Sequence, residues 1–68
     1  MRFYMKREDY IESKVINGYL VNIGIDDYGQ CFYFEYLGKD GELKEVSCGT
    51  YNLEYMDEID YYMNHMAE

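Results

Sequence analysis

The sequence predicts an α+β fold in which a four-stranded antiparallel sheet, a meander, is followed by one C-terminal helix (ββββα). Three observations predict it. Apolar residues alternate with period two in several short runs, glycine-containing turns separate those runs, and the last part of the chain changes to helical periodicity. We expect one domain, 1–68, made of a flexible lead-in (1–8), the sheet (9–49) and an amphipathic helix (52–66).

The alternating runs define one apolar face of the sheet. Asn17-Gly18, Asp26–Gly29 and Gly38–Gly41 provide turn signals between the runs. Alternation along each run then predicts which side chains share the buried face and form the core. These residues are Tyr19, Val21, Ile23, Ile25, Phe32, Phe34, Tyr36, Val46 and Cys48.

Turn chemistry predicts the register of each hairpin. Gly38-Lys39-Asp40-Gly41 suits a turn closed by a glycine at positive φ. Pairing Gly38 with Glu42 places Tyr36 opposite Lys44, Phe34 opposite Val46 and Phe32 opposite Cys48. A four-residue loop at Asp26–Gly29 places Ile23 opposite Phe32 and Val21 opposite Phe34.

The segment 7–16 has conflicting signals. Asn17-Gly18 favours a two-residue hairpin and therefore a strand before it, but that pairing puts Glu12 and Lys14 on the apolar side. A helix over 7–16, ended by Gly18, would instead place Tyr10, Ile11 and Val15 on one face. We favour the strand, with a bulge or a solvent-facing end accommodating Lys14.

The C-terminal segment is typical of a helix that packs on a sheet. Thr50 or Asn52 can serve as its N-cap, and acidic residues follow in the first turn. Its apolar stripe has i, i+3, i+4 spacing and is larger than a small sheet needs, so we expect part of it to form an oligomer interface. The stripe consists of Tyr55, Met56, Ile59, Tyr62, Met63 and Met66.

The other face of the sheet is also rich in apolar residues. Alternation places Leu20, Tyr33, Leu37 and Leu43 there, among polar residues. This composition is too apolar for the bare surface of a monomer, so we expect a homo-oligomer, a dimer or tetramer, formed by sheet-to-sheet or helix-mediated contact.

Charge is the strongest global feature. The chain has 14 acidic and 6 basic residues, with a net charge of −8. Such a chain repels bare phosphate backbones and attracts basic surfaces. Four of the six basic residues lie near the N-terminus, and Arg2, Lys6, Arg7 and Lys14, together with exposed tyrosines for base stacking, are the candidate nucleic-acid contacts.

The chain lacks the sequence signals of export, membrane spans and disulfide frameworks. No apolar run is long enough to span a membrane and no signal peptide is visible, so we expect a cytoplasmic protein and no membrane partner. Cys31 and Cys48 are expected on opposite faces of the sheet, as free thiols rather than zinc ligands.

Few residues suggest catalysis, and we do not expect an enzyme. No phosphate-binding loop, Ser-His-Asp set or Cys-His pair is visible, and we expect His65, the only histidine, at the surface. Asp26 and Asp27 are the best candidates for a catalytic pair, because they could hold the Mg²⁺ that a DNA-nicking activity would need. We interpret them instead as turn formers, and expect no resident metal or cofactor.

The hairpin at residues 35–44, EYLGKDGELK, followed by a short link and an amphipathic helix, resembles the C-terminal half of the positive-cofactor-four (transcriptional coactivator p15) family. The resemblance covers about residues 19–66. It implies a ββββα fold, dimerisation through the helix and binding of single-stranded DNA. The matching strands offer only Lys44 beside Glu35, Glu42 and Glu45, so the dimerisation is carried over and the DNA binding is not.

An acidic chain on such a fold is also similar to the small anti-CRISPR proteins of phages and mobile elements. That similarity implies inhibition of Cas9-type immunity, either by occupying a nucleic-acid channel or through DNA topology. Two alternatives stand beside it. One is a single-stranded-DNA-binding or transcription-related module, and the other is an acidic protein-interaction module with no nucleic-acid role.

Overall fold

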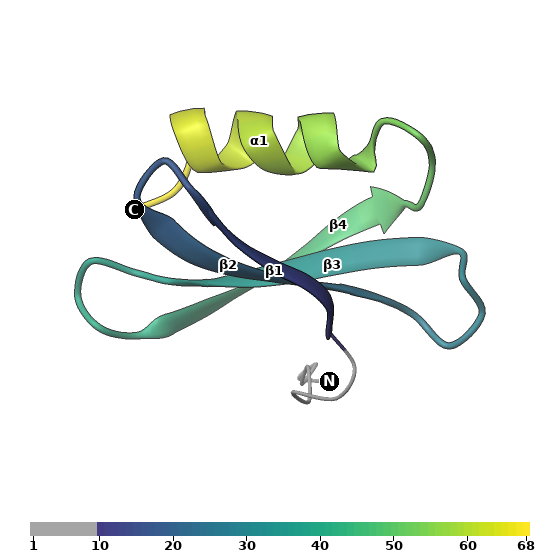
Figure 1. Cartoon of the computed structure of the whole chain (residues 1–68), viewed down its shortest axis with the longest axis horizontal. Helices are drawn as coiled ribbons and strands as arrows, with labels where there is room; N and C mark the ends of the chain where they lie inside the picture. Colours follow the sequence, from purple (N-terminus) through teal and green to yellow (C-terminus); the bar gives the residue numbers. More distant parts are fainter. Residues whose placement is uncertain (1–9) are drawn as a thin grey trace.

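The computed structural model describes residues 10–68 and shows the predicted α+β, ββββα arrangement (Figure 1). The strands form one antiparallel sheet in the order β1-β2-β3-β4, and the helix covers one face of it. The elements are β1 (Tyr10–Ile16), β2 (Tyr19–Ile25), β3 (Cys31–Leu37), β4 (Leu43–Thr50) and α1 (Tyr55–His65). The predicted lead-in (1–8) lies outside the described residues. No helix within residues 10–68 combines the length and the apolar character needed to span a membrane.

The part of segment 7–16 that the structure describes, residues 10–16, forms a strand and not a helix. Asn17 and Gly18 both have positive φ, 51° and 82°, the conformation of a type I′ hairpin turn, and Ile16 pairs with Tyr19. Glu12 and Lys14 do lie opposite Ile23 and Val21, as that pairing requires, but β1 is an edge strand and both side chains are exposed. A bulge at Ile11 then shifts the register, so that Tyr10 pairs with Gly24.

The hairpin between β3 and β4 has the predicted turn. Gly41 has a φ of 85°, and the Gly38 N–H donates to the Glu42 carbonyl at 2.8 Å. Tyr36 pairs with Lys44 and Phe34 with Val46, as expected. The pairing of Phe32 with Cys48 is not kept, because the register shifts by one residue between Tyr33 and Cys31.

The predicted register of β2 and β3 is wrong by two residues. Ile23 pairs with Phe34 and Val21 with Tyr36. Asp26 belongs to the ladder rather than to the loop, since its N–H donates to the Cys31 carbonyl at 2.9 Å, and the loop is therefore 27–30. A shift of two residues keeps every side chain on its predicted face, so the error in register does not change which residues form the apolar face.

The core lies between the sheet and α1. Val21, Ile23, Phe32 and Phe34 are buried beneath Ile59 and Met63 of the helix, and the Phe34 and Tyr62 rings meet edge to face with centroids 5.3 Å apart. The helix begins at Tyr55 rather than at 52. Asn52 instead accepts a hydrogen bond from the Glu54 N–H at 2.8 Å, in the turn before the helix.

Candidate protein-interaction surfaces

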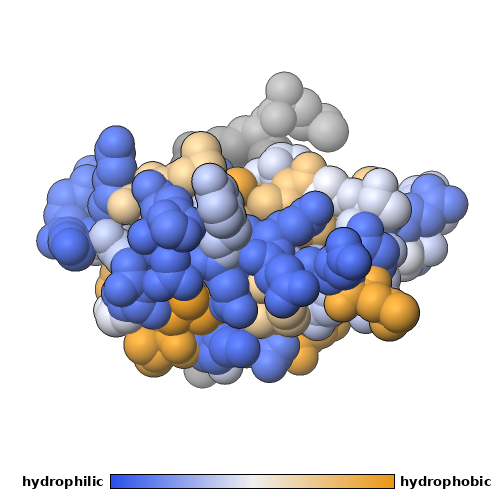
Figure 2. Space-filling model, turned by 90° about the horizontal axis from the view of Figure 1, so that it is seen from above, coloured by the Kyte–Doolittle hydropathy of each residue, from blue (hydrophilic) through white to orange (hydrophobic). Residues whose placement is uncertain are grey.

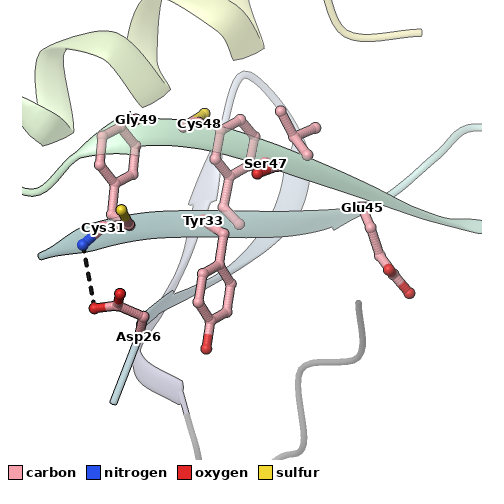
Figure 3. Close-up of a pocket in the computed structure, with 10 residues that line it drawn as sticks. Asp26, Cys31, Tyr33, Glu45, Ser47, Cys48 and Gly49 are labelled. Carbon is pink, nitrogen blue, oxygen red and sulfur yellow. Dashed lines mark hydrogen bonds between the residues drawn. The ribbon is translucent and has the colours of Figure 1, made fainter. Parts of the chain in front are cut away.

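The carboxylate of Asp26 closes a loop. It accepts hydrogen bonds from the N–H groups of Gln30 at 2.7 Å and Cys31 at 3.1 Å, the second of which is drawn in Figure 3. Asp27 is exposed in the loop. Within residues 10–68 no three His, Cys, Asp or Glu side chains are grouped so that they could hold a metal ion. The structure therefore accounts for Asp26 through backbone hydrogen bonding in a turn.

The two cysteines are both free thiols, as expected. Cys48 is half-buried on the helix side of β4, where a cavity of about 380 Å³ lies beside the β3–β4 bulge (Figure 3). Burial, and to a lesser degree the charge of Glu58, raises the pKa of the Cys48 thiol to about 11. Because the thiolate is the nucleophile, this thiol is poorly suited to covalent chemistry at neutral pH.

The apolar stripe of α1 is largely used inside its own chain. Ile59 and Met63 are buried in the core, and Tyr55, Met56 and Tyr62 pack against it half-buried. Of the six residues expected at an oligomer interface, only Met66 is exposed, at 58%. The part of α1 that faces solvent is therefore its acidic side.

The exposed side of α1 forms an acidic surface. Glu54, Asp57 and Glu58 are exposed, Asp60 is half-exposed and Glu68 is exposed near the C-terminus. The chain has no Lys or Arg from Glu45 to Glu68. Figure 2, which views the molecule from above, on the side of α1, shows a mostly hydrophilic surface. We call Glu54, Asp57, Glu58 and Asp60 the acidic helix face.

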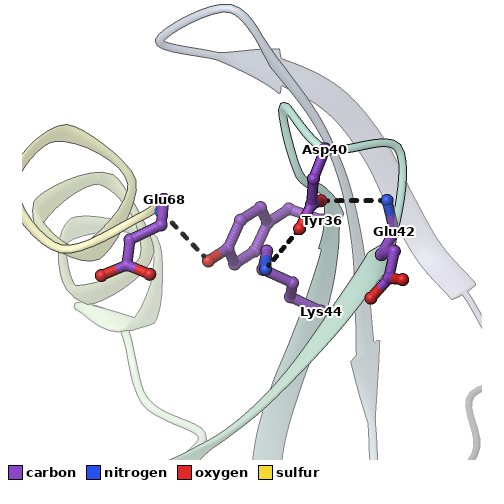
Figure 4. Close-up of polar contacts among 5 residues, drawn as sticks. All are labelled: Tyr36, Asp40, Glu42, Lys44 and Glu68. Carbon is purple, nitrogen blue, oxygen red and sulfur yellow. Dashed lines mark hydrogen bonds and ion pairs between the residues drawn. The ribbon is translucent and has the colours of Figure 1, made fainter.

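The lysines described do little to offset this charge. Lys44 forms an ion pair with Asp40 at 3.3 Å (Figure 4). The Glu42 N–H and then Lys44 lower the pKa of the Asp40 carboxyl, and Asp40 in turn raises the pKa of Lys44. Lys39 lies 5.6 Å from the centre of the Tyr19 ring. Among the four basic residues proposed to contact nucleic acid, Arg2, Lys6 and Arg7 lie outside the described residues, and Lys14 is exposed on β1.

The sheet face opposite the helix carries a buried carboxyl group that the sequence did not predict. Glu35 is 4% exposed and accepts a hydrogen bond from the Tyr10 hydroxyl. Burial, and then the charge of Glu45 directly opposite on β4, raises the pKa of Glu35. Tyr10 and Glu35 are 25 positions apart in the sequence, and they meet only because the bulge at Ile11 changes the register of Tyr10. No local sequence pattern signals that contact.

Comparisons with known proteins found no relative of this chain. No family model, curated protein or solved structure matches the chain.

Proposed function

We propose that this protein is an acidic protein-interaction module that binds the basic surface with which another protein holds nucleic acid. The observation that carries the proposal is the acidic helix face, which presents exposed carboxylates at Glu54, Asp57 and Glu58 in a segment without Lys or Arg. A surface of this charge attracts a basic groove and repels the phosphates that normally occupy it.

The fold suits this task because it holds the acidic helix face in place. Glu54 lies three and four positions before Asp57 and Glu58 at the start of α1, a spacing that places the Cβ atoms of Asp57 and Glu58 each about 5–6 Å from that of Glu54. On the opposite side of the helix, Ile59 and Met63 are fixed in the core. The backbone that carries the charges is therefore fixed before binding, and only the exposed side chains have to be ordered at the interface.

The target class to test first is the Cas9-type effector. These proteins hold a guide–target heteroduplex in a positively charged channel, which is the kind of surface that the acidic helix face complements. The resemblances of the sequence to anti-CRISPR and positive-cofactor-four-like proteins also favour a Cas9-type effector as the target. On this basis the protein inhibits CRISPR immunity by occupying the channel rather than by altering DNA.

A direct role in binding single-stranded DNA is less well supported. On the matching strands, Lys44 is paired with Asp40 and stands among the exposed acids Glu42 and Glu45, so it offers phosphates little free positive charge. A gel-shift with single-stranded and supercoiled DNA, with and without Mg²⁺, distinguishes the alternatives. We expect no retardation and no change in supercoiling; either effect would contradict channel occupation as the main activity.

The proposal is tested by neutralising the acidic helix face. A triple variant carrying Glu54→Gln, Asp57→Asn and Glu58→Gln should bind a purified Cas9-type effector at least about tenfold more weakly in a biosensor assay, because three exposed charges leave the interface. The matched control carries Glu12→Gln, Asp27→Asn and Glu42→Gln, which removes the same charge from exposed positions elsewhere. Equal losses of affinity in both variants, with folding unchanged by circular dichroism, would show that only net charge matters.

A further inference from the structure

The sheet face opposite α1 is ordered into rows that cross all four strands. Val15 pairs with Leu20 and Leu37 pairs with Leu43, while the register of β2 and β3 places Leu20 beside Leu37, one position beyond the pair Val21–Tyr36. These four residues form a continuous line of aliphatic side chains from one edge of the sheet to the other. We call Val15, Leu20, Leu37 and Leu43 the aliphatic row.

The aliphatic row is exposed along its whole length. The exposed fractions are 67% for Val15, 48% for Leu20, 42% for Leu37 and 58% for Leu43. Together they expose an apolar patch of roughly 300–400 Å², about the size of the largest patch on a typical monomer, and such patches commonly mark binding sites. Single exposed leucines are ordinary, but a row aligned across every strand is a surface that can pack.

The next row on the same face carries little exposed charge. It consists of Ser13, Asn22, Glu35 and Glu45, each opposite the next. Ser13 donates a hydrogen bond to Asn22 at 2.8 Å, and Glu35 is buried beneath Tyr10. Only Glu45 is an exposed carboxylate in this row, and its side chain points away from α1 (Figure 3). The helix α1, which carries the acidic helix face, lies on the opposite side of the sheet (Figure 1).

We propose that the aliphatic row is covered by a second copy of this chain, so that two sheets pack face to face about a two-fold axis. Three features favour a second copy over another partner. The row is aliphatic throughout, so it is complementary to itself under two-fold symmetry. Among the described residues, the aliphatic row and the row next to it carry one exposed charge, Glu45, in a chain with a net charge of −8. Packing there also turns both acidic helix faces outward, which keeps the like charges of the two chains apart.

The resulting dimer has four layers, helix–sheet–sheet–helix, and exposes two acidic helix faces on opposite sides. Its formation is driven by apolar burial, and the remaining long-range repulsion between the acidic chains opposes it. Raising the salt concentration from about 20 to about 150 mM should therefore tighten the dimer, whereas contacts between the acidic helix face and a basic target weaken with salt. The inference does not depend on the identity of that target.

The test is sedimentation equilibrium of the full chain at about 1–100 μM. We expect a monomer–dimer equilibrium, and we expect the double variant Val15→Lys, Leu43→Lys to raise the dissociation constant at least about 100-fold, because each interface would bury four unpaired ammonium groups. Leu53→Lys is the matched control, since Leu53 is fully exposed outside the row, and it should dimerise as the native chain does. Circular dichroism checks that each variant is folded.

Two results would overturn the proposal. One is a native chain that stays monomeric up to about 100 μM. The aliphatic row would then be covered by residues 1–9 or by a different protein, or it would face solvent. The other is a dimer that Leu53→Lys weakens as much as the double variant does, or that the double variant leaves unchanged, which would place the contact elsewhere.

Discussion

At the scale of single residues, Glu35 is the least expected feature. A carboxyl group in the middle of the outer sheet face is buried, faces Glu45 across the ladder and is held by the Tyr10 hydroxyl. Holding a negative charge in this position is unfavourable, which is why the pKa of Glu35 is raised. This residue therefore makes the stability of the fold depend on pH.

The direction of that dependence follows from proton binding. Below the ordinary pKa of a glutamate, Glu35 is protonated in both the folded and the unfolded chain. Between that value and its raised pKa in the folded protein, the unfolded chain loses the proton while the folded chain keeps it, so stability falls as pH rises. Above the folded pKa the full cost of the buried charge is present.

The substitution Glu35→Gln should remove this cost and keep an acceptor for Tyr10. We expect a higher midpoint of thermal unfolding than the native chain at pH 7, and a difference that shrinks toward zero as the pH falls to about 4. Differential scanning calorimetry across this range measures it. A difference that instead grows on acidification would mean that the Glu35 carboxylate stabilises the fold.

Sequence reasoning placed most core side chains correctly and missed this contact. Alternation alone puts Phe32, Phe34 and Ile23 on the buried face, and all three are buried. The contact between Tyr10 and Glu35 depends on one extra residue in β1, which reverses the side to which Tyr10 points. The sequence suggested a bulge in this strand as one way to accommodate Lys14, but the position of the bulge at Ile11 arises from tertiary pairing, which has no period of its own.

At the scale of elements, the turn between β1 and β2 also attaches the helix to the sheet. Asn17 adopts a φ of 51°, and its side-chain amide donates a hydrogen bond to the Met63 carbonyl of α1 at 3.0 Å. One residue thus sets the hairpin and holds the last turn of the helix against it. Sequence reasoning predicted the turn from Asn17-Gly18, and the link to Met63 is visible only in three dimensions.

Two substitutions separate these two roles of Asn17. Asn17→Ala should destabilise the protein by about 1.5–3 kcal/mol, because it loses the hydrogen bond and also forces alanine into the left-handed region. Asn17→Gly should cost only about 1 kcal/mol, since glycine adopts that conformation freely. Urea denaturation of both variants measures the difference, and a glycine variant that is no more stable than the alanine variant would contradict this division.

The errors in the sequence prediction fall where side chains bond to the backbone. Asp26 reads as a loop residue, yet its backbone stays in the ladder while its carboxylate closes the loop, which shifts β3 by two residues against β2. Asn52 reads as a helix cap, yet it organises the turn before α1. In both cases the residue does form local hydrogen bonds, as its type suggests. The predicted boundary of the loop or helix was wrong by one to three residues, because local hydrogen bonding competes with regular structure.

At the scale of the whole molecule, the two faces of the protein differ in character. The helix α1, which carries the acidic helix face, covers one side of the sheet (Figure 1), and strand pairing places the aliphatic row on the other side. The sequence predicted the excess of apolar residues on the outer sheet face and the acidity of the helix. It could not show that the apolar residues line up across all four strands, because that alignment depends on a register that was predicted wrongly for β2 and β3.

On the two proposals above, each face has a separate role. The charged face is suited to a basic partner, and the apolar face is suited to a second copy, so the two contacts need not compete. The acidic helix face carries the central claim, which is that the protein binds the basic nucleic-acid-holding surface of another protein.

The most direct measurement is a titration of the ¹⁵N-labelled chain with a purified Cas9-type effector, followed by amide NMR spectra. The account predicts that signals broaden or shift first over residues 54–68, and that an excess of guide–target heteroduplex reverses the change. Changes confined to Val15, Leu20, Leu37 and Leu43, or no change at all while the labelled chain remains folded, would contradict it.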